Sequence, residues 1–194
     1  EKEKDVKLAV GSAFKLGVLK TLVDDIASGQ ASWRDVHTLH AEDKSLPSGE
    51  LQNFPNNAPL TLHSLASVTV AMSDNTATDV LLYEIGRDTV EAELSASGHS
   101  DPDKTLPFLS TLQMFGLKGS PGNLSKYVAA DENTQRLILA DFEDDVAGDP
   151  SRITPPRFTE PLAIDTVEWF ASGNDLAGLA HRIAVLSDST ARDI

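Results

Sequence analysis

Apolar residues recur at intervals of three and four along most of this chain, and glycines follow several of these stretches. The first such stretch precedes Gly29 and has its apolar positions at Leu16, Leu19, Val23 and Ile26. This spacing places apolar side chains along one side of an α-helix, and glycine is common just beyond a helix end. The pattern therefore predicts amphipathic helices that pack against one another.

Further helices are predicted by the same spacing. They cover 61–72, 76–85, 88–97 and 111–117, and three more begin near 120, 131 and 172. Side chains that accept hydrogen bonds from backbone N–H groups favour helix starts, and the predicted caps are Thr61, Asp88, Asp131 and Ser172. Ser172 also forms a predicted capping box with Asp175.

Two segments lack the helical pattern. Residues 33–59 are predicted to be loop-rich with short extended pieces, and 148–163 to be irregular because they contain several prolines. No internal repeat is present. We therefore expect a mainly α protein, with residues 1–194 forming one helical domain.

Composition excludes several classes of protein. The 194 residues are 40% apolar, which is enough for a core, and no apolar run has the length that a bilayer crossing needs. The 16 basic and 30 acidic residues give a net charge of −14, so nucleic acid is not an expected partner. The absence of cysteine excludes disulfides and thiolate chemistry. No signal peptide is visible, since the first residues are polar and of mixed charge.

Ser12 and Lys15 form the first candidate site. Ser12 is predicted to lie at the N-terminus of the first helix, and Lys15 lies one turn later on the same face. A hydroxyl and an amine in this arrangement can act as nucleophile and base if burial removes the proton from the lysine. The alternative is a serine that only caps the helix.

Ser73-Asp74-Asn75 forms the second candidate site, at the break between two predicted helices. Ser73 can relay a proton to a leaving group, and Asn75 can bind a substrate carbonyl or the lysine. Asp74 is expected to turn inward and hold the loop through backbone N–H groups. The alternative is an ordinary helix connector.

Together, Ser12-Ala13-Phe14-Lys15 and Ser73-Asp74-Asn75 resemble the first two motifs of class A β-lactamases and penicillin-binding proteins. The resemblance is best over 8–98, weaker near 164–194, and interrupted by 99–163, which are longer than the family's loop there. It implies the helical lobe of the β-lactamase and transpeptidase fold, with the β-sheet lobe largely missing from these residues.

The resemblance also implies roles for the four side chains. Ser12 would be the acylated nucleophile, Lys15 its proton acceptor, Ser73 the proton shuttle and Asn75 a substrate-binding group. The backbone N–H of Ser12 would supply half of the oxyanion hole. A small acyl substrate (a β-lactam, a peptide or an ester) and a periplasmic or secreted location are implied, and no cofactor is.

The chain departs from the family at two points. The third motif, Lys-Thr-Gly, is missing: Lys104-Thr105-Leu106 lacks the glycine, and Lys20-Thr21-Leu22 lies inside the first predicted helix. The region expected to hold the deacylating glutamate, 106–117, contains no acid. An acyl-enzyme without a water-activating base would turn over slowly.

These departures leave two expectations open. One is a serine hydrolase of the penicillin-binding or esterase type. The other is a non-catalytic binding or interaction module that keeps the scaffold and self-associates through faces that the missing lobe would cover.

A metal site is not expected. His37 and His40 lie near Glu42 and Asp43, but the spacing does not fit a helical pair of ligands, and side chains of an extended segment diverge. These residues are therefore interpreted as surface groups.

Overall fold

The computed structural model describes residues 4–146 and 161–194. Its helices are α1 (Lys15–Ser28), α2 (Leu62–Ala71), α3 (Asn75–Ile85), α4 (Arg87–Ala96), α5 (Thr111–Gly119), α6 (Pro121–Ala129), α7 (Glu132–Val146), α8 (Gly173–Ala184) and α9 (Ser189–Asp193). The strands are β1 (Leu8–Ala9), β2 (Val36–Thr38), β3 (Pro59–Thr61) and β4 (Phe170–Ala171). One-turn 3₁₀ helices cover Gly11–Phe14, Leu51–Asn53 and Pro102–Thr105. The predicted mainly α fold is confirmed.

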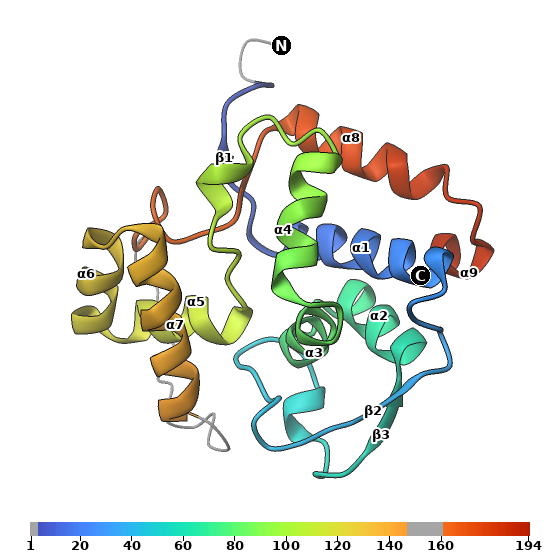
Figure 1. Cartoon of the computed structure of the whole chain (residues 1–194). Helices are drawn as coiled ribbons and strands as arrows, with labels where there is room; N and C mark the ends of the chain where they lie inside the picture. The colour runs from blue at the N-terminus through green and yellow to red at the C-terminus, as the bar shows by residue number, and fades with distance from the viewer. Residues whose placement is uncertain (1–3, 147–160) are drawn as a thin grey trace.

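Helix α1 lies at the centre of the molecule (Figure 1). It contacts α2, α3, α4 and α8, so most of its surface is covered. Val18 and Leu22 on α1 are at most 1% exposed, and they pack in one continuous core with Leu65 of α2 and Leu81 of α3. The central helix therefore holds Lys15, its first residue, in the interior.

Helices α5, α6 and α7 form a group to one side of α1 (Figure 1). Gly116 of α5 allows this packing, because a Cβ there would lie 1.9 Å from the ring of Phe142 on α7. These helices occupy most of the described part of the 99–163 segment.

Two short antiparallel strand pairs accompany the helices. Leu8 of β1 pairs with Ala171 of β4, which joins the N-terminal segment to the segment just before α8. His37 of β2 pairs with Leu60 of β3, and this hairpin contains the extended pieces predicted for 33–59.

Most of the helices with a cap predicted from the sequence begin just after that residue. Thr61 accepts a hydrogen bond from Ser64 N–H, and Ser172 forms the predicted capping box with Asp175. Two predictions were wrong. Helix α1 begins at Lys15, and Ser12 lies in the preceding 3₁₀ turn, where Gly11 has a φ of +50°. Helix α4 has Gly86 as its N-cap, so Asp88 lies in its first turn.

Most of the segment predicted to be irregular, 148–163, lies outside the described residues. Among the described residues, every helix falls short of the length or the apolar character that a membrane crossing would need.

Candidate active site

The Ser73–Asn75 corner connects α2 to α3. Ser73 has a φ of +53°, a left-handed conformation that costs a non-glycine residue free energy and persists only where its surroundings hold it. Asp74 is fully buried and caps α3 by accepting a hydrogen bond from Ala77 N–H at 2.8 Å. Its other oxygen accepts hydrogen bonds from the N–H groups of Glu50 and Leu51 at 2.7 and 2.9 Å. Asp74 therefore turns inward and joins the corner to a second loop.

That second loop, residues 45–51, wraps the corner. Asn75 donates from its backbone N–H to Ser48 O at 2.8 Å and from Nδ2 to Leu46 O at 3.2 Å. Gly49 has a φ of +111°, and a Cβ there would lie 2.2 Å from Asp74 Oδ2. Only glycine fits this position, because both the backbone conformation and the neighbouring carboxylate exclude a side chain.

Lys15 joins the first motif to the corner. Its side chain is buried, and Nζ donates to Ser73 O at 2.6 Å, to Ser73 Oγ at 3.1 Å and to Asn75 Oδ1 at 2.8 Å. The donor and its acceptors are about 60 residues apart in sequence. The structure thus brings three of the sequence-predicted site residues into direct contact.

Burial also changes the protonation of Lys15. Desolvation lowers the pKa of the amine to about 8, although the nearby carboxylates of Asp79 and Asp74 act in the opposite direction. A lysine with this pKa is partly neutral near pH 8, so it can accept a proton.

Ser12 is exposed and lies one turn before Lys15. Among the described residues, no hydrogen bond joins Ser12 Oγ to the Lys15 amine, whose three contacts all go to the corner. Ser12 does line a hollow of about 210 Å³ together with Ser48 and Asn75. Ser12 and Asn75 therefore border one shared space, whereas Lys15 and Ser73 are not among the residues that line it.

Glu168, which the sequence analysis does not assign to the site, lines the same hollow. Glu168 lies just before β4 and forms an ion pair with the buried amine of Lys118 on α5. Its neighbour Trp169 stacks on Phe14, with ring centroids 3.7 Å apart. The separation of more than 150 residues between Glu168 and Ser12 left no local signal of this proximity.

Asp79 on α3 was also missed. Its buried carboxylate accepts hydrogen bonds from Ser45 Oγ at 2.6 Å and from the backbone N–H groups of Thr111 and Leu112 at 2.7 and 2.9 Å. Burial raises the pKa of Asp79, although these hydrogen bonds act in the opposite direction. Asp79 thus connects α3 to the loop around the corner and to the start of α5.

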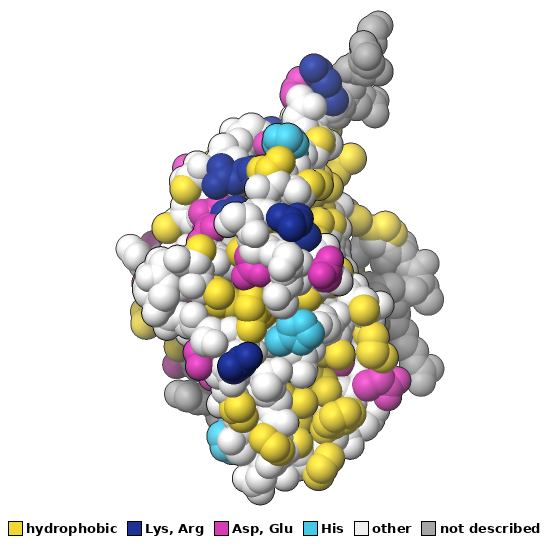
Figure 2. Space-filling model, turned by 90° about the vertical axis from the view of Figure 1, so that its right-hand side faces the viewer, with side chains coloured by type: hydrophobic (Ala, Val, Ile, Leu, Met, Phe, Trp, Pro, Cys, Tyr) yellow, Lys and Arg dark blue, Asp and Glu magenta, His cyan; other side chains and the backbone are white. Residues whose placement is uncertain are grey.

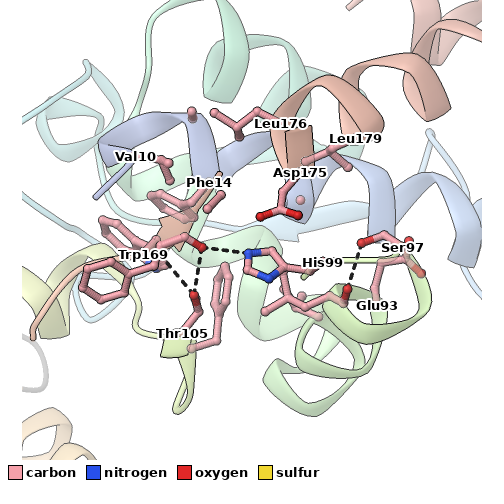
Figure 3. A pocket seen from close by; sticks show the side chains of 17 residues that line it. Val10, Phe14, Glu93, Ser97, His99, Thr105, Trp169, Asp175, Leu176 and Leu179 are labelled. Carbon is pink, nitrogen blue, oxygen red and sulfur yellow. Dashed lines mark hydrogen bonds between the residues drawn. The ribbon is translucent and has the colours of Figure 1, made fainter. Parts of the chain in front are cut away.

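A second hollow, of about 50 Å³, lies beside the first and has largely apolar walls from α1, α4 and α8 (Figure 3). Phe14 and Trp169 line both hollows. His99 Nε2 lies 2.8 Å from Phe170 O, and Thr105 Oγ1 donates to the same oxygen at 3.1 Å (Figure 3). These contacts fix β4, and neither Ser12 nor Lys15 lines this hollow.

Comparisons with known proteins agree with this architecture. The β-lactamase enzyme family matches residues 1–138. A β-lactamase from Sphaerobacter thermophilus DSM 20745 is 29% identical over 51% of this chain and 38% of its own, with a TM-score of 0.50. No curated protein matches the chain.

Several solved structures align with 98% of the chain. One is a β-lactamase from Chitinophaga pinensis DSM 2588, with 16% identity and a TM-score of 0.57 over 55% of its length. Another is PBP-A, with 17% identity and a TM-score of 0.53 over 52% of its length. The chain thus spans about half the length of these two structures. Its helices form the helical lobe of their fold, and the chain belongs to the β-lactamase enzyme family.

Proposed function

We propose that this chain is the helical part of a serine hydrolase that transfers acyl groups through Ser12, with a β-lactam, a peptide or an ester as substrate. The observation that carries the proposal is the buried Lys15 amine, which contacts Ser73 and Asn75 at hydrogen-bond distance. An ordinary helix cap would not require a buried amine with a lowered pKa.

In the proposed acylation step, Ser12 Oγ attacks the substrate carbonyl and loses its proton to neutral Lys15 Nζ. The new C–O bond gives a tetrahedral intermediate, whose oxyanion accepts a hydrogen bond from the backbone N–H of Ser12. Ser73 Oγ, 3.1 Å from the lysine, gives its proton to the leaving nitrogen or oxygen as the carbonyl re-forms, and takes in return the proton that Lys15 received from Ser12.

Asn75 has two roles in this proposal. Its Oδ1 accepts from Lys15, while its Nδ2 donates to Leu46 O, so the amide orientation is fixed on both sides. The same residue lines the hollow beside Ser12, where it can bind a substrate amide. Asp74 acts only by holding the corner in place.

Within the described residues the Lys15 backbone N–H donates to Ser12 O, but no hydrogen bond joins the Ser12 hydroxyl to the Lys15 amine. Catalytic hydrogen bonds often form only in the substrate complex, so the proposal requires the Ser12 hydroxyl to turn toward the amine when substrate binds. The family resemblance further supports a periplasmic or secreted location.

The test is covalent labelling by a fluorescent penicillin and by an activated ester, applied to the protein at the length its gene encodes. Peptide mass mapping should place the acyl group on Ser12. Ser12→Ala should abolish the label, and Ser95→Ala, at an exposed serine of α4, should leave it unchanged. Equal labelling of Ser12→Ala would refute the assignment.

The second candidate function is a non-catalytic binding module. It is favoured by the absence of acids over 106–117, where the resemblance places the deacylating glutamate. A protein that binds penicillin reversibly at this hollow, with no covalent adduct on any residue, would support the module over the hydrolase.

A further inference from the structure

A group of metal-binding side chains lies outside the candidate active site, beside the β2–β3 hairpin. It consists of His37, His40 and Asp43, each of which offers one ligand atom, and these atoms all lie within 4.8 Å of one another. The sequence predicted that these side chains diverge. That prediction was wrong because β2 ends at Thr38, and the chain then turns and brings Asp43 back toward the strand.

The His37 ring is fixed on both sides. Its Nε2 lies 2.8 Å from Asp43 Oδ2, and its Nδ1 lies 2.6 Å from Oε1 of Glu84 on α3. The side chain is 15% exposed. With a carboxylate at each nitrogen, the ring donates from both in the metal-free protein. Once Nε2 releases its proton, Glu84 keeps the other proton on Nδ1 and fixes the ring orientation, which is the arrangement found behind most metal-binding histidines.

His40 and Asp43 complete the group. His40 Nδ1 lies 3.7 Å from Asp43 Oδ2, and its side chain is half exposed, which provides an entry path from solvent. Asp43 Oδ2 is positioned by the backbone N–H of His40, which donates to it at 2.6 Å. Asp43 thus lies next to both imidazoles.

These separations suit one small cation. Zinc binds imidazole nitrogens and carboxylate oxygens at about 2.0–2.2 Å, so two ligands of a tetrahedral ion lie about 3.3 Å apart. In the structure, Asp43 Oδ2 lies 2.8 Å from His37 Nε2 and 3.7 Å from His40 Nδ1, on either side of this value. Two nitrogens and one oxygen favour zinc-like ions over calcium or magnesium, which prefer oxygen ligands.

We propose that His37, His40 and Asp43 bind a Zn²⁺ ion, with water as the fourth ligand and with Glu84 orienting His37. On binding, His37 Nε2 and Asp43 exchange their mutual contact for bonds to the ion, and any proton on Nε2 is released to solvent. The nearby carboxylates of Asp43 and Glu84 compensate the charge of the cation.

The site has a structural role in this proposal. Asp43 lies two residues before the 45–51 loop, which holds the Ser73–Asn75 corner through Ser48, Leu46 and the N–H groups bonded to Asp74. Glu84 lies near the end of α3, the helix that begins at that corner. A bound ion would therefore tie the hairpin to α3 and limit the motion of the loop.

The experiment is a titration of the untagged, chelator-treated chain with ZnCl₂ by isothermal calorimetry. Absorption spectra with Co²⁺ as the probe ion report the coordination geometry. We expect one site per chain, d–d bands of a four-coordinate Co²⁺ ion, and a melting temperature that rises with zinc concentration. His40→Asn should weaken zinc binding about tenfold or more and remove the melting shift, and Glu84→Gln should weaken binding by a smaller factor.

His181→Asn is the matched control, because His181 is an exposed histidine on α8, away from this group. It should bind zinc as the unmodified chain does. The melting temperature of each metal-free variant checks that the fold is retained, and His40 is exposed enough for that to be expected. No binding up to ~1 mM zinc, or equal affinity in His40→Asn and the unmodified chain, would overturn the proposal.

Discussion

Lys15 shows how one residue gains its chemistry from position. Burial disfavours the charged amine, and the acceptors around it are neutral: a carbonyl, a hydroxyl and an amide oxygen. Asp79 and Asp74 are close enough to raise the pKa, but burial has the larger effect and the pKa falls to about 8. The residue is therefore held near the boundary between its charged and neutral forms.

The proposed acylation rate should follow the neutral fraction of Lys15. With a pKa of about 8, this fraction rises as pH increases, so labelling of Ser12 should be about tenfold faster at pH 9 than at pH 7. The measurement is the second-order rate of labelling by an activated ester between pH 6 and 10.

Spontaneous hydrolysis of the ester also increases with pH, so the rate seen with Ser12→Ala is subtracted at each pH. Lys15→Met should remove the inflection together with most of the rate. A flat or falling profile after subtraction would contradict the role of Lys15 as the proton acceptor.

At the scale of elements, α3 is the part that organises the site. Its first turn is capped by Asp74, and one turn later Asp79 accepts hydrogen bonds from the start of α5 and from Ser45. The buried carboxylates of Asp74 and Asp79 thus hold α3, the 45–51 loop and the start of α5 in fixed positions relative to one another. Each buried N–H group that they satisfy would otherwise lose its hydrogen bond to water without replacement.

Replacement of Asp79 should therefore destabilise the fold strongly. Asp79→Ala leaves the N–H groups of Thr111 and Leu112 and the Ser45 hydroxyl without their acceptor, and we expect a loss of at least ~3 kcal/mol in the free energy of unfolding. Urea unfolding followed by circular dichroism measures this loss.

Asp165→Ala is the comparison, because Asp165 is exposed and no hydrogen bond to its side chain occurs within the described residues. Its change should stay within ~0.5 kcal/mol. A similar, small effect for both substitutions would mean that α5 is positioned by apolar packing rather than by this carboxylate.

At the scale of the whole molecule, the chain aligns along 98% of its length with PBP-A and with the Chitinophaga pinensis β-lactamase, and it spans about half the length of each. Apolar side chains reach the surface, and in the view of Figure 2 they gather mainly in the lower half, below the level of α8. Helix α8 has no fully buried residue, although its sequence is amphipathic. Faces of this kind favour association with another protein surface.

Self-association of the 194-residue chain should depend on salt. Its net charge of −14 repels a second copy at low ionic strength, and added salt screens this repulsion while apolar contacts remain. We expect the weight-average mass in sedimentation equilibrium to rise with protein concentration in high salt and to rise less in low salt. A monomer under both conditions would argue against the interaction-module alternative.

Much of the local structure could be predicted from the sequence. A helix, the glycine that follows it and its N-terminal cap all depend on residues within one or two turns of the chain. The local pattern of side chains therefore predicts them, as it does for the caps at Thr61 and Ser172. The errors were local as well. Ser12 precedes α1 because residues 11–14 form a 3₁₀ turn, in which Ala13 N–H donates to Val10 O, and sequence periodicity does not report this backbone conformation.

The sequence by itself determined which chemical groups are available: a serine three residues before a lysine, and a serine–asparagine pair between two helices. Only the tertiary structure decided that the lysine reaches that pair, that Glu168 faces the same hollow, and that His37, His40 and Asp43 meet. These contacts depend on how helices and loops pack across long separations in sequence. Burial then sets the protonation of Lys15, and burial is a property of the packed core rather than of any short motif.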